Sequence, residues 1–229
     1  MYRRLGRTIL ALVVAGATTI GWAQESGKQP PRQTTPTHQQ HKHQQQQQGD
    51  AEMQAWIEAA TPGPQHRLMN YCIGEWQATW KHWFAPGQEA PPEQGICVNE
   101  WVLGGRFIKT TFRGTFMGMP YEGVGYTGFD KVTGKFVSTW MDNMSTSIMY
   151  EMGSYDPDKK LFTYTSEMQQ PTGVIAQQTT TVQIINDNQH VMTFYQKLPG
   201  MEQPKKVMEV TFNRLKKAKP PTTRTKSPD

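Results

Sequence analysis

The stretch "GEWQATWKHWF", residues 74–84, carries three tryptophans within eight positions, directly after a glycine. If this stretch is a β-strand, alternate side chains share one face of the sheet. The even-numbered face is then the more apolar one, and we expect it to point into the core. Trp83, on the other face, should lie at the rim or under an N-terminal helix. The predicted core-facing residues are Trp76, Ala78, Trp80, His82 and Phe84.

The chain beyond this stretch is rich in Thr, Val, Tyr, Phe and Trp, and it is interrupted by turn residues every dozen positions or so. No long helical pattern breaks the series. We therefore predict an all-β fold, an antiparallel meander β-barrel of about ten strands, since closure removes exposed sheet edges. A two-sheet sandwich is the alternative. The expected strands are 75–84, 95–103, 106–117, 120–129, 135–143, 146–155, 161–168, 174–185, 190–197 and 205–214.

One or two short helices should precede the barrel. In "AEMQAWIEAATPG", residues 51–63, apolar side chains recur at helical spacing, and Pro62-Gly63-Pro64 ends the pattern. The segment "QHRLMNYCIG", residues 65–74, predicts a second short helix that Gly74 stops.

The last expected strand has the same parity as the first. Phe212 and Arg214 share a face there, and in a closed meander the last strand pairs with the first. Arg214 can then lie across the ring of Trp76, a cation–π contact of about 1–2 kcal/mol when it is partly desolvated. Arg106 begins another strand at the same end. We therefore predict one structural cluster at the closed end of the barrel, made of Trp76, Arg106 and Arg214.

Two resemblances support this fold. Gly74-Glu75-Trp76 with the late Arg214 resembles the Gly-x-Trp and terminal-arginine arrangement of the calycin barrels, the lipocalins and fatty-acid-binding proteins. The segments 56–69, 103–108, 116–149, 153–156 and 207–214 resemble the bacterial DUF1579 family, a domain of unknown function. That resemblance implies a single lipocalin-like barrel domain. It implies no catalytic or binding residue.

The two ends of the chain differ from its centre. Residues 1–23 have early arginines, an apolar run and a Gly-Trp-Ala ending, as in a secretory signal peptide that is cleaved after Ala23. Residues 24–50 predict a disordered Gln/His-rich linker, and 216–229 a disordered basic tail. The single domain should span 51–215. We expect a periplasmic or secreted protein with no integral membrane segment after signal cleavage.

The net charge of +5 comes from the ends of the chain. Of the 24 basic and 19 acidic residues, 11 basic and 3 acidic ones lie outside 51–215, which leaves the core near −3. Nucleic-acid binding needs clustered cations on the folded surface, so we expect no nucleic-acid partner.

The two cysteines, Cys72 and Cys97, are expected to be separate buried thiols. A hairpin centred on residues 88–90 would place Cys97 opposite Lys81, about nine residues along the strand direction from Cys72 and beyond disulfide reach. A disulfide is the alternative if the second helix folds back.

The core shows no metal-binding spacing and no nucleophile motif. No cofactor is predicted, although haem ligation through His82 or His190 stays open. Asp142 fits a turn better than a catalytic acid.

An aromatic lining with few polar groups is typical of a small-molecule site. We therefore expect a barrel that binds a small, largely apolar ligand. One alternative is an enzyme that uses His82 with Asp142 or Glu100. Another is a ligandless packed barrel that acts through its surface or as a homodimer. The expected ligand-binding residues are Trp80, His82, Phe112, Tyr126, Trp140 and Asp142.

Overall fold

The structure, a computed structural model, describes residues 38–85 and 88–217. The predicted signal peptide, residues 24–37 of the predicted linker and residues 218–229 of the predicted tail lie outside these ranges. The chain divides into two compact units, Met1–Gln47 and Gln48–Asp229, and the second contains the barrel.

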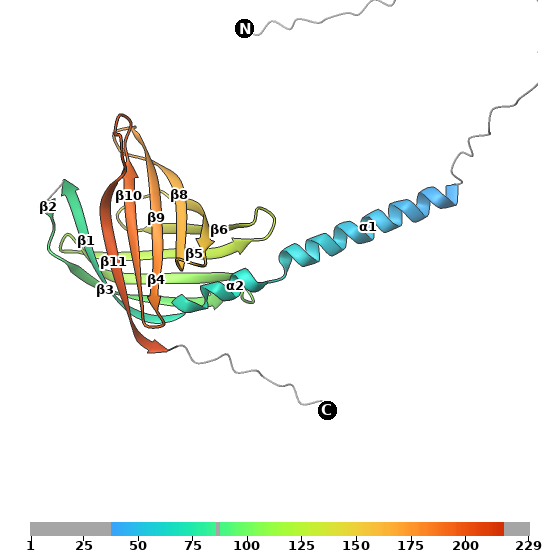
Figure 1. The fold of residues 1–229 in the computed structure, drawn as a ribbon, viewed down its shortest axis with the longest axis horizontal. Helices are drawn as coiled ribbons and strands as arrows, with labels where there is room; N and C mark the ends of the chain where they lie inside the picture. The colour runs from blue at the N-terminus through green and yellow to red at the C-terminus, as the bar shows by residue number, and fades with distance from the viewer. Residues whose placement is uncertain (1–37, 86–87, 218–229) are drawn as a thin grey trace, which may run out of the picture. The chain divides into compact units, whose positions relative to one another are not determined.

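Ten antiparallel strands form a closed meander (Figure 1). Each strand pairs with the next, and β11 pairs with β1, so the sheet has no free edge along these strands. The barrel prediction is therefore confirmed, and the sandwich alternative is wrong. A two-residue strand, β2 (Gln88–Glu89), adds to the outer end of β1. The barrel strands are β1 (Gly74–Ala85), β3 (Glu93–Val102), β4 (Phe107–Phe116), β5 (Met119–Asp130), β6 (Lys135–Asp142), β7 (Met149–Asp156), β8 (Leu161–Gln169), β9 (Ile175–Asn186), β10 (Gln189–Lys197) and β11 (Lys205–Lys217).

The parity of β1 is the one that the sequence predicts. Trp76, Ala78 and Trp80 are fully buried on the inner face. Phe84, at the far end of the same face, is 64% exposed, so β1 leaves the core before it ends. Trp83 faces outward, and its ring is covered by Lys206, whose Nζ lies 4.3 Å from the ring centroid.

The two ends of the barrel are built differently. The end at which β1 begins, here called the closed half, is covered by α2 (Pro64–Leu68) and the 3-10 turn η1 (Met69–Cys72). Met69 is buried there and packs with Ile108 and Phe162. The end at which β1 finishes, here called the open half, carries the β4–β5, β6–β7, β8–β9 and β10–β11 connections.

Helix α1 (His38–Ala60) is longer than expected. Residues 38–50, where the sequence predicts a linker, belong to this helix in the structure. Glutamine has a high intrinsic helix propensity, which allows the Gln tract to extend the predicted helix toward the N-terminus. Trp56, on the apolar stripe of α1, is 72% exposed. Among the described residues, no helix is long and apolar enough to cross a membrane.

The predicted register of the first hairpin is wrong. Cys97 pairs with Trp76 rather than with Lys81, because the chain between β1 and β3 is a longer excursion that contains β2. Cys72 therefore lies near Cys97 in the closed half. Both are nevertheless free thiols. Burial raises the pKa of each thiol to about 12, so both are protonated at neutral pH.

Candidate ligand-binding interior

The closed half contains the expected contact between Arg214 and Trp76. The guanidinium carbon of Arg214 lies 4.0 Å from the centroid of the indole ring. The strand register explains this contact, since Trp76 pairs directly with Arg214 across β1 and β11. The indole Nε1 of Trp76 donates to the carbonyl of Cys72 at 2.6 Å, so the buried ring has its polar atom satisfied.

Arg214 also binds three main-chain carbonyls. Its Nη1 donates to Ile73 O and its Nη2 to Tyr71 O, both at 2.5 Å. Its Nε donates to Asp187 O at 2.7 Å. The side chain thus joins β11 to η1 and to the β9–β10 turn. We call Trp76 with Arg214 the plug.

Arg106 does not belong to this cluster, which corrects the prediction. It is exposed in the β3–β4 turn, where its Nη1 donates to Leu103 O at 3.2 Å. The error lies in the strand stagger. The register joins Trp76 to Cys97 and Cys97 to Phe112, so Arg106 lies six positions along β4 from the level of Trp76.

His190 completes the packing of the plug. Its ring meets Trp76 edge-on at 4.4 Å and stacks on Phe212 at 4.6 Å. Its Nδ1 is buried without a hydrogen-bond partner. Burial, with a smaller contribution from Arg214, lowers the pKa of His190 to about 3, so the ring is neutral. The ring of His190 is thus enclosed by aromatic side chains and is 4% exposed.

The open half carries a continuous set of aromatic side chains on its inner face. Trp80 meets Phe112 edge-on at 5.2 Å, and Phe112 meets Tyr121 at 5.6 Å. Tyr121 in turn accepts a hydrogen bond from Trp140 Nε1 at 3.0 Å. We call this set the aromatic wall. It consists of Trp80, Phe112, Phe116, Tyr121 and Trp140.

Tyr126 is not part of the aromatic wall, which corrects another prediction. It faces outward on β5 and is 38% exposed. The inward residues of β5 have odd numbers, because Gly123 and Gly125 lie against the ring of Trp140. A Cβ on Gly123 would come within 2.1 Å of that ring. Tyr121 therefore takes the place expected for Tyr126. The glycines at alternate positions of "YEGVG" were the signal for this parity.

Asp142 has both a turn role and an inward contact. Its Oδ1 accepts from the backbone N–H of Met144 at 3.0 Å, which is the turn role that the sequence favours. Its Oδ2 accepts from the hydroxyl of Tyr121 at 3.2 Å. Glu100, the other acid of the enzyme alternative, is exposed on β3 and faces away from the interior.

His82 lies at the mouth of the aromatic wall. Its ring meets Phe116 edge-on at 4.7 Å, and its Nε2 is buried without a hydrogen-bond partner. Burial lowers the pKa of His82, and the charge of Glu93 opposes that shift. A neutral imidazole with a free nitrogen can orient a ligand through one hydrogen bond.

A second inner surface, on β7 to β10, was not predicted from the sequence. Glu151 Oε1 accepts from Thr180 Oγ1 at 2.6 Å and from Gln178 Nε2 at 3.2 Å. Gln196 Nε2 donates to Gln178 Oε1 at 3.3 Å, which extends the network toward the open end. We call this set the polar wall. It consists of Glu151, Ser166, Gln178, Thr180 and Gln196.

Glu151 is unusual because it is a buried acid with neutral neighbours. Burial raises its pKa, while the hydrogen bonds from Thr180 and Gln178 act in the opposite direction. The two walls meet at Met149. This residue pairs with Trp140 across β6 and β7, and its Sδ lies 3.1 Å from Gln178 Nε2.

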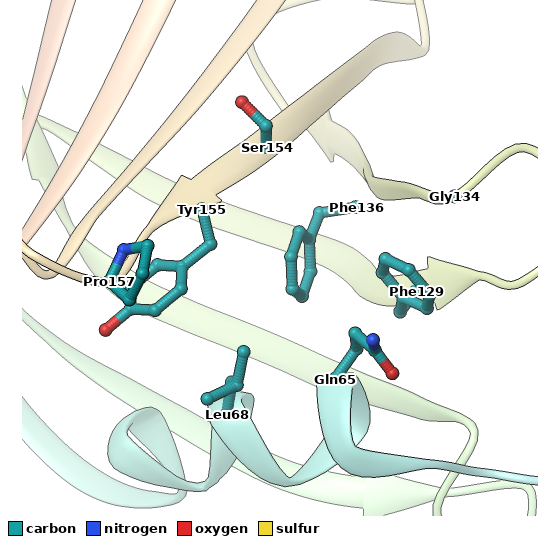
Figure 2. Close-up of a pocket in the computed structure, with 8 residues that line it drawn as sticks. All are labelled: Gln65, Leu68, Phe129, Gly134, Phe136, Ser154, Tyr155 and Pro157. Atoms are coloured by element: carbon teal, nitrogen blue, oxygen red, sulfur yellow. The ribbon is translucent and has the colours of Figure 1, made fainter.

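A cavity of about 390 Å³ lies at the other end of the molecule, between α2 and the closed-half ends of β5, β6 and β7 (Figure 2). It is separate from the predicted site. His66 is buried nearby, where its ring meets Phe129 and its Nδ1 accepts from Gly63 N–H, so it helps to hold α2 in place. The lining residues are Gln65, Leu68, Phe129, Gly134, Phe136, Ser154, Tyr155 and Pro157.

The sequence of residues 61–214 matches the family described as "Protein of unknown function (DUF1579)". The chain belongs to the DUF1579 family. No curated protein matches this DUF1579 chain.

Solved structures similar to this DUF1579 protein have low sequence identity to it, and two of them are described as β-barrels. A redesigned β-barrel has a TM-score of 0.35 and 16% identity, with 66% of this chain and 96% of that chain covered. A de novo designed fluorescence-activating β-barrel has a TM-score of 0.32 and 18% identity, with 63% and 94% covered. A protein of unknown function from the DUF3598 family of Nostoc punctiforme has a TM-score of 0.21 and 6% identity, with 67% and 100% covered.

Proposed function

We propose that this protein is an exported barrel module that binds a small, largely apolar ligand in the open half of its interior. The signal-peptide pattern of residues 1–23 supports export. The aromatic wall supports an apolar ligand, since ligand sites combine apolar and aromatic lining with a few placed polar groups.

One observation carries the proposal. His82 Nε2 is a buried polar atom without a hydrogen-bond partner, and it lies in the open half against the ring of Phe116. A buried polar atom that stays unpaired costs about 1–3 kcal/mol, so such atoms usually have a partner. A ligand that enters between the aromatic and polar walls would reach His82 Nε2.

Native mass spectrometry of protein from its own host tests both parts of the proposal. We expect a mature chain that begins at Gln24 and carries a small molecule of defined mass. A chain that retains residues 1–23 would contradict export. A preparation without bound mass would leave ligand binding to the titration that follows.

The titration uses fatty acids, aromatic alcohols, aromatic amines and haem, with tryptophan fluorescence and thermal shift as readouts. A paired substitution on β1 separates inside from outside. Trp80→Leu removes an aromatic-wall ring, whereas Trp83→Leu removes an outward ring from the same strand. An aromatic contact contributes about 0.5–1.5 kcal/mol, so Trp80→Leu should weaken binding about tenfold. Trp83→Leu should leave it unchanged. If no compound of the panel quenches or shifts the parent, the protein is a packed barrel without a ligand.

A further inference from the structure

Resting on this proposed function, we propose that the ligand is an organic amine whose ammonium group binds Glu151 from inside the barrel. The apolar part of the same ligand would lie on the aromatic wall. The proposal therefore assigns Glu151, a residue with no role in the ligand site expected from the sequence, as the specificity-determining group.

Glu151 is placed for this role by its surroundings. It is only 2% exposed and lies on the inner face of β7. Its hydrogen-bond donors, Thr180, Gln178 and Ser166, are neutral. Within residues 38–85 and 88–217, no Lys, Arg or His side chain forms an ion pair with Glu151. Ion pairs there include Lys81–Glu89, Arg113–Glu122, Lys159–Asp156 and Lys206–Glu209, and none of these involves Glu151.

A buried carboxyl group without a cation is an incomplete arrangement. Charged groups inside proteins are normally paired, because an isolated buried charge loses its hydration without compensation. Burial raises the pKa of Glu151, and the hydrogen bonds from Thr180, Gln178 and Ser166 oppose that shift by favouring the ionised form. An ammonium group would supply the missing positive charge, which a fatty acid or a neutral alcohol does not.

The neighbouring groups suit the rest of an amine. Ser166 Oγ is buried beside Glu151 and donates to its carboxyl group, so the lone pairs of this hydroxyl can accept from an ammonium N–H. Trp140 lies beside the polar wall, since it pairs with Met149, whose Sδ contacts Gln178. The faces of indole and phenol rings attract cations, and their area contacts apolar groups. One ligand can therefore satisfy both walls.

Access is from the open half. Met149 and Gln196 lie near the open-half ends of β7 and β10, and both are only partly buried. They stand between Glu151 and the open end. The closed half is obstructed by the plug and by Met69.

The experiment compares three probes of nearly equal size: 2-phenylethylamine, 2-phenylethanol and 3-phenylpropionate. Each is titrated calorimetrically at neutral pH into the parent, Glu151→Gln and Glu167→Gln. Glutamine keeps the shape of Glu151 but removes its charge. Glu167 is the matched control, because it is exposed on β8 next to Ser166.

We expect the parent to bind the amine at least about tenfold more tightly than the alcohol. The carboxylate should bind weakest. Glu151→Gln should abolish the preference, and Glu167→Gln should retain it.

Three results would overturn the proposal. Equal binding of amine and alcohol by the parent would remove the role of Glu151 and leave an apolar binding module intact. This comparison needs no variant, so it decides the matter even if Glu151→Gln does not fold. Unchanged amine binding by a folded Glu151→Gln would assign the amine to another site. If these probes and the wider panel all fail to bind the parent, the proposed function fails as well.

Discussion

The two halves of the barrel use similar side chains in opposite ways. In the closed half, Trp76 and Arg214 give their polar hydrogens to main-chain carbonyls of Cys72, Ile73 and Tyr71. In the open half, His82 Nε2 is buried and unpaired. A satisfied and close-packed region stabilises a fold, whereas unpaired polar atoms beside aromatic rings are typical of a binding site.

The two inner histidines differ in the same way, since one is enclosed by its neighbours and the other is partly exposed. His190 in the closed half touches Trp76 and Phe212 and is enclosed by them. His82 in the open half is only partly buried and lies against Phe116 near the end of β1. An unpaired nitrogen therefore indicates a ligand site only where a ligand can reach it. His190 Nδ1 is unpaired because the surrounding rings exclude any partner, whereas His82 Nε2 is available for binding.

The largest difference between the halves should appear in stability. Trp76→Ala should cost about 3–5 kcal/mol, because it removes a fully buried ring and the partner of Arg214. Trp140→Ala, in the partly buried aromatic wall, should cost less. Denaturant unfolding of both variants measures the two losses. If Trp76→Ala unfolds with the free energy of the parent, the plug is not structural and the contrast disappears.

A smaller difference should appear in the pH dependence of stability. The pKa of His190 is about 3 in the folded protein, against the ordinary histidine value of 6.5. Between these values the unfolded chain binds more protons, so the parent loses stability as pH falls below 6.5. At pH 5 the loss from this residue should be about 2 kcal/mol.

His190→Phe keeps a ring in the plug and removes the titrating group, so its stability should fall less steeply between pH 6.5 and pH 5 than that of the parent. His82→Phe should change the slope less, since His82 is only partly buried. Parallel unfolding curves for the parent and His190→Phe over this range would show that His190 is accessible to protons in the folded state.

The features that the sequence predicted depend on strong alternation. In β1 and β11, large apolar residues occupy every second position, and this parity led to the closed barrel and to the contact of Arg214 with Trp76. Phe112, Trp80 and Trp140 were found for the same reason. The spacing of large side chains on one strand is a local property, and a sequence contains it directly.

The wrong or missing predictions have two causes. Some depend on the stagger between neighbouring strands, and others on strands whose two faces do not differ in polarity. Arg106 and Cys97 were misplaced because register depends on loop lengths and on the tilt of the barrel. The polar wall was missed because β9 reads "IAQQTTTVQIIN", with polar residues on both faces, so alternation does not identify its inner side. Glu151 became visible only when the fold placed it beside Gln178 and Thr180.

The central claim is that ligand enters the open half and leaves the plug untouched. The indole N–H signals of Trp80, Trp140 and Trp76 report on these regions separately, and they can be assigned with Trp→Phe variants in ¹H–¹⁵N spectra. We expect titration with 2-phenylethylamine, and separately with 2-phenylethanol, to move the Trp80 and Trp140 signals and to leave Trp76 unchanged. Movement of Trp76 with Trp80 and Trp140 unaffected would place the ligand in the closed half and contradict this account.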